Sequence, residues 1–256
     1  MAQSAAPQPG DTFLLFNGST SFVEIPSRPE YSIPATGFLT VSSWIRPDVL
    51  DFPQAQEDGY VYWLGKGDRS NERGNREWAC RIYNLHNTAC PPRPSQISFY
   101  VFNPAGGLGV GSRSVIPIVA GEWIHVVGLV DETRVRQFRD GIPKDCDTYR
   151  GPGSSQCKPF FNEGEQVVVE PRAGAAPVRI GTRDRKSFFL GGVTRVRIWN
   201  RLLTEAEITA LHESDTASRE GLVAEFLLNS DTQTLAVDTV SGNSGAIHDA
   251  IWAVQA

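Results

Sequence analysis

The chain has 256 residues, of which 40% are hydrophobic and 21% charged, and its formal net charge is −5. Proteins that bind nucleic acid usually carry a basic excess or a basic stripe, and neither is present, so no nucleic-acid partner is expected. No run of 18 or more apolar residues occurs, so we expect no membrane insertion.

Residues 1–10 are predicted to form a disordered N-terminal lead, and residues 11–256 a single domain, because no linker or composition break divides them. The lead has neither the basic region nor the apolar region of a secretory signal peptide. The remaining length suits one all-β sandwich.

Short β-rich segments separated by turn residues follow in chain order. Residues 12–16 and 21–25 flank an Asn-Gly turn, which is a strong hairpin signal. Further strands are expected at 37–47, 60–64, 78–84, 96–103, 123–130, 134–139, 166–170, 178–182, 193–199, 222–227 and 247–253. Many short strands with regular turns predict an all-β fold of two antiparallel sheets.

One helix is predicted near the C-terminus, at residues 205–212. Thr204 can cap its first turn, and Glu207 three residues later completes a capping box. Ile208 and Leu211 form its buried stripe.

The four cysteines form two local pairs, and their spacing does not match that of zinc sites. Each pair brackets a loop rich in turn-forming residues, so we predict the disulfides Cys80–Cys90 and Cys146–Cys157. Disulfides favour an oxidising compartment, which predicts a secreted or cell-surface protein. The alternative is four free thiols in a cytosolic protein.

Several motifs together resemble the laminin-G-like (concanavalin A-like) jelly-roll family. They are LLFNGSTSFVEIP from residue 14, FLTVSSWIRPD from 38, GEWIHVVGLVDE from 121, VRQFRDGIP from 135 and GGVTRVRIWNRLLTEAEI from 191. The resemblance covers about residues 12–253. It implies a two-sheet jelly roll with a concave face and rim loops. Members of this family bind glycans, proteins or steroids, often with calcium, so the fold alone does not define the function.

Signatures of catalysis are missing from the sequence. Glycoside hydrolysis needs two carboxylates on one surface, and jelly-roll glucanases carry them as Glu-x-Asp-x-x-Glu, which this chain lacks. It also lacks the G-x-S-x-G nucleophile elbow of serine hydrolases with a Ser-His-Asp triad. His125, in the middle of a predicted strand, is interpreted as a buried, hydrogen-bonded structural residue. We therefore predict that the protein is not an enzyme.

A ligand surface is predicted on the face of two neighbouring strands that points away from the core. Arg81 and Tyr83 alternate with core positions on one strand, and Tyr100 takes the matching face of the next. Rim loops would add Asp68, Asn71, Arg183 and Arg185. Together these residues predict an arginine-rich, aromatic-floored cleft for a glycan, an acidic one included. The alternative is that the tyrosines are ordinary cross-strand packing pairs.

A calcium ion is the predicted cofactor. The double-calcium site of the pentraxins, which are similar in fold, is in doubt, because residues 182–186 hold one Asp among three cations. A single structural calcium ion is predicted where the first and last strands meet, with oxygen ligands from Asn17, Asp238 and Asp249. The alternative is that Asn17 only shapes its turn and Asp238 only begins a loop.

The preferred interpretation is a non-catalytic, lectin-like recognition module whose partner is a glycan or glycoprotein. Two alternatives stay open: an adhesion or scaffolding domain that binds a protein, and a polysaccharide hydrolase or lyase with an unrecognised site. The sequence predicts neither the identity of the ligand nor the oligomeric state.

Overall fold

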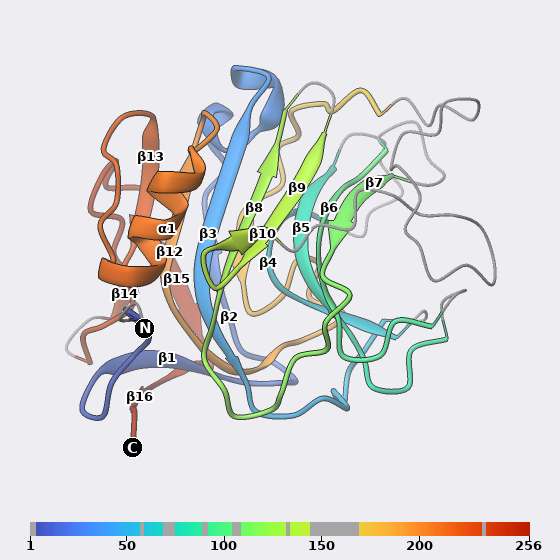
Figure 1. Cartoon of the computed structure of the whole chain (residues 1–256), viewed down its shortest axis with the longest axis vertical. Coiled ribbons are helices and arrows are strands. Elements are labelled where there is room, and N and C mark those ends of the chain that lie inside the picture. The colour runs from blue at the N-terminus through green and yellow to red at the C-terminus, as the bar shows by residue number, and fades with distance from the viewer. Residues whose placement is uncertain are drawn as a thin grey trace.

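The chain folds into two antiparallel β-sheets that face each other, with one α-helix on the outside (Figure 1). The computed structural model describes residues 4–56, 59–68, 75–88, 92–103, 109–131, 134–143, 169–231 and 234–256. The predicted all-β jelly-roll sandwich with a short C-terminal helix is confirmed. No helix in these ranges is long and apolar enough to cross a bilayer.

Sheet A carries the helix. Its strands, in spatial order, are β10 (Ile142–Pro143), β9 (Val135–Arg139), β8 (Ile124–Val130), β3 (Leu39–Pro47), β12 (Leu190–Trp199), β1 (Thr12–Asn17) and β16 (Ile251–Val254), and β13 (Leu222–Phe226) also pairs with β12. The first and last strands of the chain, β1 and β16, are therefore neighbours, as predicted.

Sheet B lies on the other side of the core. Its strands, in spatial order, are β14 (Leu235–Ala236), β15 (Gly245–His248), β2 (Phe22–Ile25), β11 (Val178–Ile180), β4 (Tyr60–Gly67), β5 (Arg76–Tyr83), β6 (Ile97–Val101) and β7 (Val110–Arg113). Two 3-10 turns, Pro29–Tyr31 and Ile33–Ala35, follow β2 in the chain.

Alternating side chains of both sheets meet in one apolar core. On β3, Leu39, Val41 and Ile45 belong to this core. Trp44 lies on the opposite side of β3, where its ring stacks with that of His212 from the helix at a centroid distance of 5.6 Å. The strand is therefore buried on both faces, because the helix covers the second one.

The helix, α1 (Glu205–Ser214), starts as predicted. The Thr204 side chain accepts a hydrogen bond from the Glu207 backbone, and the Glu207 side chain accepts one from the Thr204 backbone. Ile208 and Leu211 are buried in a second apolar cluster on the outer face of sheet A. This contact positions α1 on sheet A, away from sheet B.

The predicted strand at 247–253 is two strands that belong to different sheets. β15 pairs with β2 in sheet B, whereas β16 pairs with β1 in sheet A. The chain turns between them at Asp249, which has a left-handed φ of 51°. The strands β7, β10 and β14 were not predicted. Residues 169–170 are not in a strand, and 166–168 lie outside the described ranges.

Residues 4–10, assigned to the N-terminal lead, form hydrogen bonds with the domain. The Ala5 amide donates to the His212 carbonyl at 2.7 Å, and the Gly10 amide donates to the Gln255 carbonyl at 2.9 Å. The division of the chain at residue 10 stays a prediction.

Cys80 is a free thiol, so the predicted Cys80–Cys90 disulfide is wrong. Its side chain points into the core from β5 and is only 2% exposed. This burial raises the pKa of the thiol. Cys90 lies outside the described residues, as do Cys146 and Cys157, so the Cys146–Cys157 disulfide stays a prediction.

Candidate functional site

The outer face of sheet B carries a cluster of arginine and aromatic side chains, which we call the Arg–Tyr face. Its members are Tyr60, Tyr62, Arg81, Tyr83, Arg93, Tyr100, Phe102 and Arg183. Strand alternation creates it: Trp78, Cys80 and Ile82 of β5 enter the core, so Arg81 and Tyr83 point outward.

The register between β5 and β6 then brings the predicted residues together. Arg81 is opposite Ser98 and Ala79 is opposite Tyr100. The prediction that Arg81, Tyr83 and Tyr100 share the face away from the core is confirmed.

Arg81 lies at the centre of the Arg–Tyr face. Its Nε donates to Ser98 Oγ at 2.9 Å and its Nη2 donates to Tyr83 Oη at 2.8 Å. Its guanidinium carbon lies 4.0 Å from the ring centre of Tyr100 and 4.9 Å from that of Tyr60. The tyrosine rings therefore hold the cation by cation–π attraction and leave little of it exposed.

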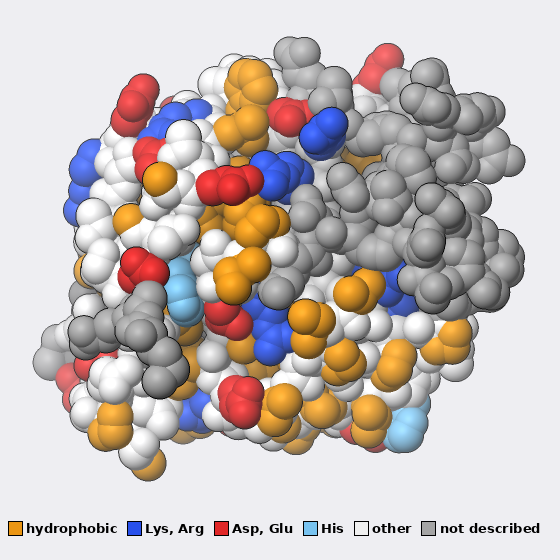
Figure 2. All heavy atoms as spheres, viewed as in Figure 1, with side chains coloured by type: hydrophobic (Ala, Val, Ile, Leu, Met, Phe, Trp, Pro, Cys, Tyr) orange, Lys and Arg blue, Asp and Glu red, His pale blue; other side chains and the backbone are white. Residues whose placement is uncertain are grey.

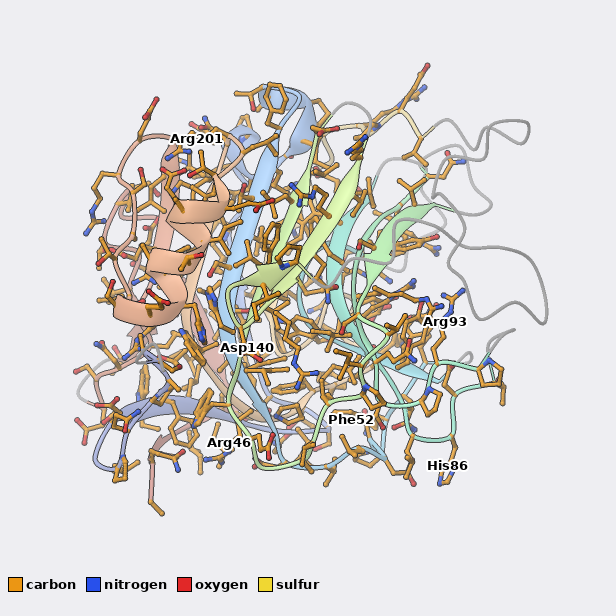
Figure 3. All side chains as sticks on the ribbon, viewed as in Figure 1. Arg46, Phe52, His86, Arg93, Asp140 and Arg201 are labelled. Carbon is orange, nitrogen blue, oxygen red and sulfur yellow. The ribbon has the colours of Figure 1, made fainter. Side chains whose placement is uncertain are left out.

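Tyr83 accepts hydrogen bonds from two guanidinium groups. Besides Arg81, Arg93 donates from Nη1 to Tyr83 Oη at 2.8 Å. Burial by itself would raise the pKa of Tyr83, but the two nearby cations outweigh it and hold the pKa below its usual value. Figure 3 shows Arg93 on the opposite side of the view from Arg201, which lies next to α1.

Tyr100 is fixed in place by Gly109, which precedes the neighbouring strand β7, and by Gly111 within that strand. Its hydroxyl accepts a hydrogen bond from the Gly109 amide at 2.5 Å. A Cβ atom at Gly109 or Gly111 would come within 2.8 Å of the Tyr100 ring, so larger residues would displace the ring. Burial raises the pKa of Tyr100, so its hydroxyl stays neutral at ordinary pH.

Arg183 is buried, at 1% exposure, and is not the exposed rim residue that was predicted. Its guanidinium carbon lies 4.6 Å from the ring centres of both Tyr62 and Phe102. Its Nη2 donates to Asp184 Oδ2 at 2.8 Å. The sequence showed three cations around one acid in this loop, but not that the acid would pair internally with Arg183.

The other predicted rim residues are separate from Arg81. Asp68 Oδ1 accepts a hydrogen bond from Arg179 Nη1 at 2.7 Å and forms an ion pair with it. Arg185 is exposed and has a left-handed φ of 55°. Asn71 lies outside the described residues.

The structure does not bring the three predicted calcium ligands together. Asn17 and Asp249 lie at the same end of the β1–β16 pair, whereas Asp238 lies near the opposite end of β15. Asn17 Oδ1 accepts hydrogen bonds from the amides of the following turn, the closest at 2.9 Å from Ser19 and Thr20. Asp238 Oδ1 accepts from three amides, among them that of Val240 at 3.0 Å. These oxygens therefore organise turns, and calcium binding at any site stays a prediction.

His125 is buried on the outer face of sheet A beneath α1, at 1% exposure. Its Nε2 lies 2.9 Å from Ser42 Oγ, and its amide donates to Asp140 Oδ1. The interpretation of His125 as a buried, hydrogen-bonded histidine is confirmed.

A cavity of about 370 Å³ opens between the two sheets. Its walls are mainly apolar, with valines from β6, β7, β8 and β9, and its charged side chains are Asp131, Arg134 and Glu170. None of the predicted ligand residues lines it. A saccharide needs many polar partners, so this cavity suits one less well than the Arg–Tyr face does.

Four members of the Arg–Tyr face were not predicted. Tyr60 and Tyr62 alternate on β4 and Phe102 follows Tyr100 by two positions, so their period-2 spacing was a usable signal. Arg93 lies in the loop before β6, and no periodicity could have placed it. Arg183, though predicted, joins through its contact with aromatic rings rather than at the rim.

Comparison with known proteins identifies the family. No curated protein sequence matches the chain. Among solved structures, a proposed carbohydrate-binding protein from Bacteroides ovatus is similar at a TM-score of 0.58 and 15% identity; the match covers 97% of this chain and 61% of that one. The SAP-like pentraxin of Limulus polyphemus, a heptamer, is similar at a TM-score of 0.52 and 14% identity, covering 96% of this chain and 95% of that one.

At such low identity these likenesses show a shared fold and no more. The chain spans less than two thirds of the Bacteroides ovatus protein. A family model, in contrast, matches residues 17–209, which is well over half of the sequence. The chain therefore belongs to the concanavalin A-like lectin/glucanases superfamily.

Proposed function

We propose that this chain is a non-catalytic module that binds a carbohydrate on the Arg–Tyr face. The observation that carries the proposal is the arrangement around Arg81, whose guanidinium is surrounded by the rings of Tyr60, Tyr83 and Tyr100. Aromatic rings offer apolar area to a sugar ring, and guanidinium N–H groups donate to its oxygens. A ligand site usually combines such area with a few placed polar groups.

The opposite face of the molecule is a weaker candidate. On the side that carries α1, acidic, basic and hydrophobic side chains are interspersed (Figure 2). The arginines there already have partners: Arg201 binds Glu207 at 2.5 Å and Arg136 binds Glu205 at 3.1 Å.

The non-catalytic part of the proposal rests on the carboxylates. Glycoside hydrolysis requires one carboxyl group as acid and a second as base or nucleophile. Asp68 and Asp184, which border the Arg–Tyr face, are each bound to an arginine. Ion pairing of this kind keeps a carboxylate ionised and unsuited to donate a proton.

Binding to a single short saccharide should be weak, because few atoms are buried. Multivalent presentation would raise the avidity without new contacts. We also propose that the protein acts outside the cell, where such ligands are displayed, although the free Cys80 thiol removes one of the two disulfides that argued for this location.

A glycan array, followed by calorimetry on the best hit, tests the proposal. Tyr60→Ala should weaken binding about tenfold, because it removes one aromatic wall around Arg81. Phe38→Ala, which removes an exposed aromatic ring just before β3, is the matched control and should bind as wild type. Equal affinity of the Tyr60→Ala variant and wild type would refute this site.

The same preparation separates the alternatives. Capture of a protein partner without any glycan hit would favour an adhesion domain. Shortened products after incubation with the bound oligosaccharide would favour a hydrolase or lyase. Repeating the array with a chelator tests the calcium prediction.

A further inference from the structure

Buried arginines in the described part of the chain follow one rule with one exception. Burying a charge is costly unless it is paired, so buried arginines normally contact a carboxylate. Three of the four do so: Arg179 with Glu24 and Asp68, Arg183 with Asp184, and Arg197 with Asp215 and Glu225, all at 2.6–2.9 Å. Arg81 is the exception.

Arg81 is surrounded by neutral groups. It is 8% exposed, and its hydrogen-bond acceptors are the hydroxyl groups of Ser98 and Tyr83. Among the described residues no carboxylate lies within 4.0 Å of its nitrogens, and its Nη1 has no hydrogen-bond partner there. Within the described ranges its positive charge is therefore offset only by the faces of the tyrosine rings.

A second guanidinium, that of Arg93, adjoins the first and has no carboxylate partner among the described residues. Arg93 also donates to Tyr83 Oη, and its own Nε is buried with no hydrogen-bond partner in the described part of the chain. The two cations thus share one neutral oxygen, each at 2.8 Å. Like charges repel at this separation, so an anion bound beside them would gain from both.

The effect of this field is visible on Tyr83. Its pKa is lowered despite burial, because Arg81 and Arg93 both favour the phenolate. A negative charge is therefore favoured at this position, and the carboxylate or sulfate of a ligand is better suited to supply it than a phenol is.

We propose that the ligand is an anionic glycan whose carboxylate or sulfate group is bound by Arg81 and Arg93 beside the Tyr83 hydroxyl. This inference rests on the proposed carbohydrate-binding function and names its ligand class. Guanidinium groups bind such oxyanions through paired N–H donors, and the tyrosine rings of the face would carry the rest of the saccharide. Neutral sugars would leave both cations without a counter-charge.

The first test uses the wild-type protein, so no variant has to fold. Calorimetry compares an oligouronate, its carboxyl-reduced neutral counterpart, and a sulfated oligosaccharide of the same length. The oligouronate or the sulfated sugar should bind at least about tenfold tighter than the neutral sugar, as expected for a charge-assisted hydrogen bond. The preferred anion distinguishes carboxylate from sulfate recognition. Added salt should weaken only the charged ligands.

The second test locates the site with Arg93→Met and Arg81→Lys. Arg93 is half-buried, so its replacement spares the core, and Arg81→Lys keeps the charge while removing the guanidinium fork. Each should lower affinity for the anionic sugar about tenfold, in line with the loss of a charge-assisted contact. Arg136→Met, on the outer face of the other sheet, is the control and should bind as wild type.

The outcomes separate the two proposals. Equal binding of neutral and anionic sugars would overturn the anionic inference and leave the carbohydrate-binding proposal intact. Binding of no sugar would overturn both. Anion preference that survives both arginine substitutions would show that another surface holds the charge, which also overturns the inference.

Discussion

Acidification should destabilise this protein through His125, because the folded state holds that imidazole neutral. Burial is the main cause that lowers the pKa of His125 to about 3 from 6.5, and the nearby His212, Arg197 and Arg195 add to it. Its Nδ1 has no hydrogen-bond partner and is enclosed, so the protonated ring would place an unpaired donor in the interior.

The direction and the size of this loss of stability follow from the difference in proton binding between the folded and the unfolded state. The unfolded chain binds a proton near pH 6.5 and the folded chain does not, so stability is full above pH 6.5 and falls as the pH drops toward 3. Between pH 7 and pH 5 the loss is about 2 kcal/mol, at 1.36 kcal/mol for each pKa unit. This loss of free energy changes little as long as the pKa of His125 in the folded state stays below about 4, because almost no folded protein then carries a proton on His125 at pH 5.

Urea unfolding at pH 7, 6 and 5, followed by tryptophan fluorescence, measures this loss. The variant His125→Gln keeps a polar group that can reach Ser42 and removes the titration. The stability difference between wild type and His125→Gln should therefore shrink by about 2 kcal/mol from pH 7 to pH 5. The variant His86→Gln, at an exposed loop position, should show no such change.

A difference that is independent of pH would refute the reasoning, since it would mean that the folded state accepts a proton at His125. A histidine NMR titration of the wild type gives the same answer if the His125→Gln variant does not fold. If the signal of the His125 ring titrates near pH 6.5 in the folded protein, the lowered pKa of His125 is contradicted.

Three further predictions test the site, the helix and the cysteine. Binding of an anionic glycan should weaken as the pH rises toward the lowered pKa of Tyr83, because its phenolate would neutralise the guanidinium pair; calorimetry between pH 7 and 10 should show this decline in wild type and none in Tyr83→Phe. Thr204→Ala should lower the free energy of unfolding by about 1 kcal/mol through loss of the helix cap, whereas Thr209→Ala, at a half-buried position that caps neither end of the same helix, should not. Without reductant, an alkylating reagent should modify Cys80 only after the protein is denatured, and failure to modify it even then would restore the disulfide.

Local sequence patterns were sufficient for much of the fold. Strand alternation placed Arg81, Tyr83 and Tyr100 on one face, because successive side chains of a strand point to opposite sides and a buried face fixes the register. The capping box at Thr204 and Glu207 was equally local, since it needs only residues three positions apart.

Contacts between distant segments decided the rest. Nothing near Arg183 in the sequence shows that Tyr62 and Phe102 will enclose it, and no periodicity brings the loop residue Arg93 to Tyr83. The cysteine spacing suggested a disulfide at Cys80, although the alternation that turns Arg81 outward also directs Cys80 into the core. Asp249 divides an apolar segment between two sheets because the last strand pairs with the first one, across almost the whole length of the chain. The sequence by itself thus determined which residues face outward, and the tertiary structure decided which of their charges are paired, because pairing depends on neighbours that only folding brings within a few ångströms.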